Sequence, residues 1–205
     1  YKAIEEKKDA SYYLAQINYL NSIEPPPSGG RYVFSSNGKE QEIIKLANKG
    51  LELDPNNHHL INSRGTAKLN IPSAALQKYA NAWIEIGMDW RHPKYQSIFD
   101  IYRQASSGRL YNETSNINAL ESLIDFKMAY KYKPDYIKAR INASIVYDRL
   151  AYGLKNDDYR LKAIEEINKA QEYEPKESQL YMLNAHYKLT NKNYKGCNDY
   201  VTALT

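Results

Sequence analysis

Apolar residues recur along this chain at intervals of three and four positions, in segments of ten to twenty residues. Such spacing places the apolar side chains on one side of an α-helix. The nearest approach to a strand is the stretch RYVFSS, which is short and isolated between Gly30 and Gly38. The pattern predicts an all-α fold. Its helices are expected at residues 3–22, 39–53, 57–69, 72–88, 94–106, 116–132, 135–153, 157–173, 177–190 and 193–204.

Proline and glycine mark most of the joints between these segments, as in LDPNN, NIPS, KPD and EPKES. The consecutive prolines Pro25, Pro26 and Pro27 cannot continue a helix, because proline has no amide hydrogen to donate and its ring clashes with the preceding turn. The widest joints are residues 23–38 and 107–115. Elsewhere the joints are short, as in helical hairpins.

A repeat is visible around the prolines that stand just before a predicted helix. Three of them, Pro55, Pro134 and Pro175, share a pattern upstream, and the last interval is 41 residues. A small residue lies five positions before each proline, where it lets two helices approach closely, and a residue that fills the gap between helix pairs lies one turn earlier. The small residues are Gly50, Ala129 and Ala170, and those one turn earlier are Ala47, Phe126 and Ile167. Pro93 fits this pattern only after a slip of one residue.

These segments resemble the tetratricopeptide repeat. QEIIKLANKGLELDPNN resembles its second helix and closing turn, SLIDFKMAYKYKPD and AIEEINKAQEYEP resemble two further copies, and LYMLNAHYKLTNKNYKGCNDYVTAL resembles a nearly whole repeat. The resemblance covers residues 38–205, and residues 1–37 add a helix and a Pro/Gly-rich loop. It implies a single domain over residues 1–205. The expected fold is an α-solenoid, a right-handed superhelix of about five stacked antiparallel hairpins.

Two features depart from the family pattern. About seven extra residues stretch the repeat between Tyr147 and Ala163, and the region 72–132 is irregular. The last repeat ends at NDYVTALT without an obvious polar capping helix, so this end of the stack is expected to pack against something further.

The composition narrows the class of partner. The net charge is +4, but the excess of Lys and Arg is spread along the chain, whereas a surface for nucleic acid usually gathers them. We therefore expect no nucleic-acid partner. No run of eighteen apolar residues exists, so no direct insertion into a membrane is expected.

The sequence offers few candidates for a metal-binding or catalytic residue. His58 and His59 stand in LELDPNNHHL, but adjacent residues on a helix point about 100° apart and cannot both chelate one metal easily. Asp54 and Pro55 are expected to stop one helix there, and Asn56 or Asn57 to cap the next. Cys197 excludes an internal disulfide and fits a small core residue better than a nucleophile. We expect no metal, no cofactor and no enzymatic activity.

The resemblance places a partner surface on the first helix of each hairpin, which lines the concave side of the superhelix. This surface is a mixed polar and apolar groove suited to an extended peptide or a helix. The alternative is that some of these positions pack between hairpins or simply meet solvent. The predicted contact residues are His59, Asn62, Thr66, Asp100, Gln104, Lys138, Asn142, Ile145, Gln179 and His186, with Ser97, Ile141 and Met182 on the same helices.

Three functions are compatible with the sequence. We favour a scaffold or adaptor that binds another protein or peptide through the concave groove or the uncapped end, which also offers a surface for self-association. The second is a regulatory or substrate-docking module of a larger enzyme. The third, least favoured, is a helical repeat that binds nucleic acid, whose affinity would fall steeply with salt. For location, we favour an exported or periplasmic bacterial protein, with a cytoplasmic one as the alternative.

Overall fold

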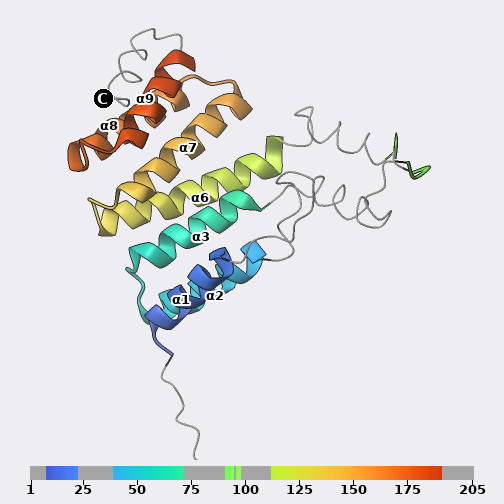
Figure 1. Cartoon of the computed structure of the whole chain (residues 1–205), viewed down its shortest axis with the longest axis vertical. Coiled ribbons are helices and arrows are strands. Elements are labelled where there is room, and N and C mark those ends of the chain that lie inside the picture. The colour runs from blue at the N-terminus through green and yellow to red at the C-terminus, as the bar shows by residue number, and fades with distance from the viewer. Residues whose placement is uncertain (1–7, 23–38, 72–90, 95, 98–111, 191–205) are drawn as a thin grey trace, which may run out of the picture.

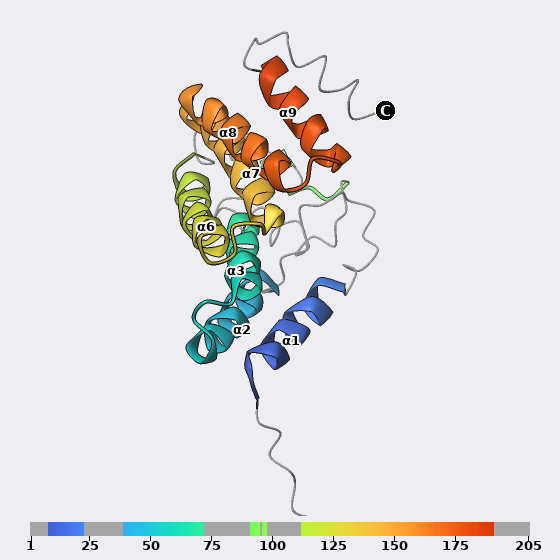
Figure 2. The ribbon, with the colours of Figure 1, turned by 90° about the vertical axis from the view of Figure 1, so that its left-hand side faces the viewer.

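The computed structural model describes residues 8–22, 39–71, 91–94, 96–97 and 112–190. Its helices are α1 (Ala10–Ser22), α2 (Lys39–Leu53), α3 (His58–Asn70), α6 (Asn112–Tyr132), α7 (Ile137–Leu154), α8 (Asp158–Tyr173) and α9 (Ser178–Thr190). These helices form one stack, with α1 and α9 at opposite ends (Figure 1, Figure 2). The described residues include no strand, and the predicted all-α fold is confirmed.

Each helix packs on the next along this stack. The pairs α1–α2, α3–α6 and α7–α8 form hairpins, and α9 packs on α8. Apolar side chains join the members of the stack: Ile17, Ile43 and Leu60 belong to one core at the α1 end. Phe126 and Ile167 belong to a second core, which extends to α9. The hydrophobic core is therefore distributed along the stack in successive clusters rather than gathered at one centre, as a solenoid requires.

α3 and α6 are neighbours in space although residues 71–111 separate them in the chain. α3 packs along α6, so these two helices form a hairpin although the helices predicted at 72–88 and 94–106 lie between them in the sequence. The helix predicted at 72–88 and most of that at 94–106 lie outside the described residues. Pro55 and Pro134 are 79 residues apart in the sequence. If the 41 residues 71–111 between α3 and α6 are left out, 38 remain, which is close to the 41 residues between Pro134 and Pro175.

The three proline turns have the same backbone hydrogen bonds. In each, the N–H of the residue before proline donates to the carbonyl of the small residue four positions earlier, and the N–H two residues after proline donates back across the turn. The first bonds are Asp54–Gly50 at 2.9 Å, Lys133–Ala129 at 3.0 Å and Glu174–Ala170 at 3.0 Å; the second are Asn57–Asp54 at 3.2 Å, Tyr136–Lys133 at 3.0 Å and Glu177–Glu174 at 3.2 Å. The repeat seen in the sequence is thus a repeat in backbone geometry.

The small residues lie where two helices approach closely. Ala129 and Ala170 are fully buried. A Cβ at Gly50 would stand 2.6 Å from Leu60 Cδ1 on α3. A second close approach, at Gly65 of α3, would put a Cβ 2.8 Å from Phe126 Cε1 on α6. These distances are shorter than van der Waals contact, so glycine sets the spacing of α3 from both its neighbours.

The predicted helix boundaries hold to within a few residues at most ends. α2 matches the prediction, while α6 begins four residues earlier than expected. α1 begins at Ala10 rather than in the predicted position near residue 3, because Asp9 caps it: its Oδ1 accepts from the N–H of Tyr12 at 3.0 Å. The helix predicted at 193–204 lies outside the described residues.

Candidate protein-binding face

Three equivalent positions of α3, α7 and α9 recur four, seven and eleven residues after the preceding proline. We call their side chains the A-helix face. The set is His59, Asn62 and Thr66 on α3, Lys138, Ile141 and Ile145 on α7, and Gln179, Met182 and His186 on α9. Each helix presents these positions on one side because three and four residues make about one turn.

The exposure of these side chains differs from position to position and from helix to helix. The first position is exposed in all three helices, at His59, Lys138 and Gln179. The second is buried at Asn62 and Ile141. On α9 the same position is Met182, which is 53% exposed. The third position is half-buried on α3 and α7 and exposed on α9. The α9 end of the face is thus the most open.

Side-chain hydrogen bonds hold the helices of this face side by side. Asn142 Nδ2 of α7 donates to Asn62 Oδ1 of α3 at 3.0 Å, and it also lies 3.5 Å from Thr66 Oγ1. Thr66 in turn donates to the carbonyl of Asn62 at 3.0 Å. Asn62, Thr66 and Asn142 were predicted to contact a partner, and the structure brings them together; in this arrangement their polar groups bond to one another.

A second link joins α7 to α9. The hydroxyls of Ser144 and Tyr187 are 3.2 Å apart, and both side chains are buried. Burial raises the pKa of Tyr187 to about 12, so this phenol stays protonated and can donate at neutral pH. Ser144 then accepts, because its own proton goes to the carbonyl of Ile141 at 2.7 Å. The two links together fix the mutual positions of α3, α7 and α9.

The two histidines of LELDPNNHHL pack on Tyr136, which belongs to the next proline turn. The ring of Tyr136 lies edge-on to both, at 4.8 Å from the His58 centroid and 5.1 Å from that of His59. Burial, and next the charge of His59, lower the pKa of His58. Asn57 caps α3, since its Oδ1 accepts from the N–H of Leu60 at 3.1 Å. The predicted turn is confirmed, with Asn57 as the cap.

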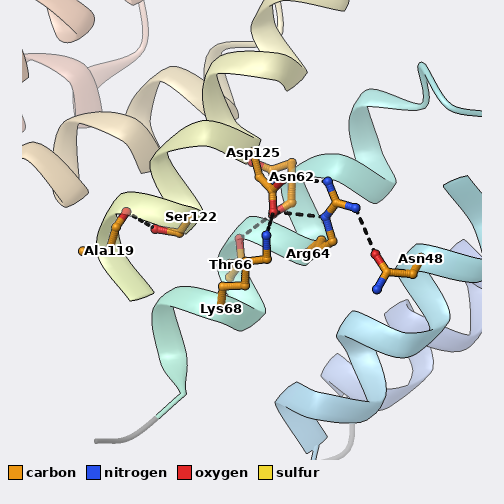
Figure 3. A network of polar contacts seen from close by, with 8 residues as sticks. All are labelled: Asn48, Asn62, Arg64, Thr66, Lys68, Ala119, Ser122 and Asp125. Carbon is orange, nitrogen blue, oxygen red and sulfur yellow. Dashed lines mark hydrogen bonds and ion pairs between the residues drawn. The ribbon is translucent and has the colours of Figure 1, made fainter. Parts of the chain in front are cut away.

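An ion-pair network joins α3 to α6 (Figure 3). Asp125 is almost fully buried and accepts from Arg64 Nε at 3.1 Å and Arg64 Nη2 at 2.7 Å. Lys68 Nζ lies 2.9 Å from the same carboxylate. Arg64 also donates to Asn48 Oδ1 of α2 at 2.9 Å, so a single guanidinium joins three helices.

The next hairpin has a similar network. Arg140 of α7 donates to Glu166 Oε2 of α8 at 2.9 Å, and Tyr130 of α6 donates to Glu166 Oε1 at 3.0 Å. The Arg140 guanidinium lies 4.3 Å from the centroid of the Tyr130 ring. Burial, followed by the charge of Glu166, raises the pKa of Tyr130.

Neither network was predicted from the sequence. One signal was present: Asp125 interrupts the apolar run LIDF, and Glu166 stands beside Ile167 on the packed side of α8. Charged residues at inward positions of a packed helix need partners, because an unpaired buried charge is costly. The sequence alone does not say which helix supplies the partner.

Some predicted contact residues are not placed by the structure. Asp100 and Gln104 lie outside the described residues. Ser97 is exposed, and its hydroxyl donates to the carbonyl of Lys94 at 2.8 Å. Within the described ranges, no three His, Cys, Asp or Glu side chains gather as ligands of a metal ion. None of the described helices is long and apolar enough to cross a membrane.

Comparisons with known proteins give little further information. No family model matches the chain, and no curated protein matches it. Among solved structures, the crystal structure of MamA protein is similar over 95% of this chain and 90% of that chain, with 16% sequence identity and a TM-score of 0.37. The description of this chain as an all-α stack of helical hairpins rests on its own turns and helix packing.

Proposed function

We propose that this chain is a divergent tetratricopeptide-repeat scaffold, without enzymatic activity, that binds a peptide or protein segment on its A-helix face. The observation that carries the proposal is the pair of side-chain links from α3 to α7 and from α7 to α9, the half-buried Asn62–Asn142 and the buried Ser144–Tyr187. They hold three helices together while equivalent side chains on the same side of each stay exposed. A preorganised face of this kind reduces the entropy lost on binding.

The composition of the face favours a protein partner. His59, Lys138 and Gln179 offer hydrogen-bonding groups at one level of the three helices. Met182 adds an exposed and adaptable apolar side chain, and His186 lies one turn away on α9. Interfaces between proteins combine apolar contacts with a polar rim in this way. The α9 end is the proposed centre of binding because its apolar contact position is open.

The test is affinity capture with matched variants, followed by identification of the bound proteins. Lys138→Glu combined with Met182→Glu places charge on the face at exposed positions and should leave the fold intact. The control is Lys49→Glu, an exposed lysine on α2, which is not one of the helices of the face. We expect specific partners that bind the wild type and the control, and that bind the face variant at least about tenfold more weakly. The proposal fails if no partner is captured, or if the face variant and the control retain the same partners equally.

A further inference from the structure

The helices that carry the A-helix face are nearly free of acidic residues. α3 and α9 contain none within their bounds. α7 contains one, Asp148, which accepts from Arg160 Nε of α8 at 3.3 Å. By contrast, α2, α6 and α8 hold acidic and basic residues in similar numbers. The sign of the charge therefore distinguishes the helices of the face from the helices that they pack against.

Two basic residues lie on the same side of α7. Lys138 and Arg149 are eleven residues apart, so at 100° per residue their side chains leave the helix within about 20° of each other. Both are exposed, and neither has a carboxylate partner among the described residues. Arg149 Nη1 donates to the carbonyl of Leu69 at 3.4 Å, which uses only one of the donor groups of a guanidinium. Both cations are thus available to a carboxylate of a partner.

The residues between these two cations offer an apolar contact. Asn142 and Ile145 lie within about 60° of them on the same side of α7. The amide of Asn142 already contacts Asn62 and Thr66 of α3. Ile145 is half-buried and has no polar group to offer. We call Lys138, Asn142, Ile145 and Arg149 the α7 row; it has a positive charge at each end and an apolar side chain between them.

The length of the α7 row matches a short extended segment. At 1.5 Å per residue, the Cα atoms of Lys138 and Arg149 are about 16 Å apart along the helix. An extended chain covers about 3.3 Å per residue, so residues about five positions apart in such a chain reach both cations. α9, which carries Met182, is held beside α7 by the bond between Ser144 and Tyr187, so one segment can contact both helices.

We propose that the segment bound by the A-helix face is acidic and extended, with two carboxylate side chains about four to six residues apart and an apolar residue between them. This proposal rests on the proposed function and names the chemistry of its partner. The carboxylates form charge-assisted hydrogen bonds with Lys138 and Arg149, and the apolar residue packs on Ile145. A nucleic acid fits the α7 row less well, because phosphates follow one another closely and surfaces that bind them gather many cations.

The first test selects binders to the full chain from a library of displayed random peptides of about twelve residues. Peptides that bind the wild type should be enriched in Asp and Glu at the proposed spacing. The enrichment should disappear on Lys138→Gln combined with Arg149→Gln. The matched control, Lys49→Gln combined with Lys131→Gln, loses the same charge at exposed positions of α2 and α6 and should keep the enrichment.

The outcomes of this selection separate the two proposals. Neutral or basic peptides that bind the wild type but not Met182→Glu would overturn the acidic partner and leave the proposed function standing. Acidic peptides that bind the Lys138 and Arg149 double variant as well as the wild type would also overturn it, because their site would lie elsewhere. If no peptide is selected, the A-helix face fails as a binding site and both proposals fall.

The second test measures the affinity of one selected peptide by fluorescence anisotropy. Exchange of its two acidic residues for their amides should raise the dissociation constant at least about tenfold, and so should the Lys138 and Arg149 double variant. The two changes together should weaken binding little more than either alone, because they remove the same contacts. Fully additive effects would contradict the proposed pairing. Displacement of the peptide by an equal concentration of single-stranded DNA would contradict the preference for a protein segment.

Discussion

The guanidinium of Arg64 binds both carboxylate oxygens of Asp125 across the interface of α3 and α6. The two residues are 61 positions apart in the chain and form a bidentate pair, the geometry in which arginine binds a carboxylate most specifically. Because Arg64 also bonds to Asn48, this pair fixes α3 against both of its neighbours in the stack.

Removing the charge of Asp125 should destabilise the protein. Asp125→Asn keeps the shape of the side chain but leaves Arg64 and Lys68 without their anion, and we expect a loss of about 2 to 3 kcal/mol in the free energy of unfolding. Urea denaturation measures it. The control is Glu165→Gln, which breaks the exposed pair with Lys169 on α8 and should cost no more than about 0.5 kcal/mol. If both variants lose the same free energy of unfolding, the Arg64–Asp125 pair does not stabilise the interface of α3 and α6 more than an exposed pair does.

Gly65→Ala should also destabilise, contrary to the usual effect in a helix. Alanine is normally favoured over glycine in a helix by about 1 kcal/mol. Here the added Cβ would lie 2.8 Å from Phe126 Cε1 and 3.1 Å from Asp125 Cβ, so α3 and α6 must separate, at a cost of about 1 to 3 kcal/mol. Thermal unfolding gives the sign directly, with Ser63→Ala on the same helix as a control that should lose little. A higher melting temperature for Gly65→Ala would contradict the close approach.

Lys155→Gly should stabilise the end of α7. Lys155 has φ of 50° and ψ of 42°, a left-handed conformation, and its N–H bonds to the carbonyls of Ala151 and Tyr152. Glycine adopts this conformation without the steric cost of a Cβ, so we expect a gain of about 1 kcal/mol. Lys155→Ala retains the Cβ and removes the rest of the side chain, so it serves as the control. If both variants are stabilised equally, the backbone conformation is not the cause.

Acidic pH should lower the free energy of unfolding, in part through the protonation of His58. Its pKa in the folded state is lowered, by burial first and by the charge of His59 next, so the unfolded state binds the proton more strongly. The free energy of unfolding should therefore fall as the pH drops through and below the ordinary pKa of histidine, about 6.5. We expect a shallower fall between pH 7 and pH 5 in His58→Gln. Parallel pH profiles for the two proteins would rule out this contribution.

The sequence predicts the helices here better than it predicts their pairing. Helical spacing depends on residues three and four apart, and it gave α2 its observed bounds at Lys39 and Leu53. The pairing of α3 with α6 depends on residues such as Arg64 and Asp125, which only tertiary packing brings together. The spacing of 79 residues from Pro55 to Pro134, about twice the interval at Pro175, was a sign of the intervening segment.

The A-helix face shows the same limit: the sequence predicts positions on a helix better than the contacts they make. The proline turns recur before α3, α7 and α9, and His59, Lys138 and Gln179, four residues after each proline, are exposed. Asn62 is one of the equivalent positions and Asn142 is the neighbour of another, Ile141, yet these two amides bond to each other. A polar residue on a helix satisfies the periodicity equally well against water or against a neighbouring amide, so spacing alone cannot separate the two.

The pairing of α3 with α6 is the central structural claim, and shortening the chain between them tests it most directly. Asn118 Nδ2 of α6 lies 3.3 Å from the carbonyl oxygen of Ile71 at the end of α3. The start of α6 is about 9 Å further along the helix, at 1.5 Å per residue. A flexible linker of about six Gly and Ser residues can span that distance in place of residues 72–111.

The measurement is cooperative unfolding of this shortened variant, followed by circular dichroism. If α3 and α6 are the two helices of one hairpin, the variant stays helical and unfolds in a single transition near the melting temperature of the full chain. A variant that loses its helical signal, or that melts without cooperativity, would contradict the pairing of α3 with α6.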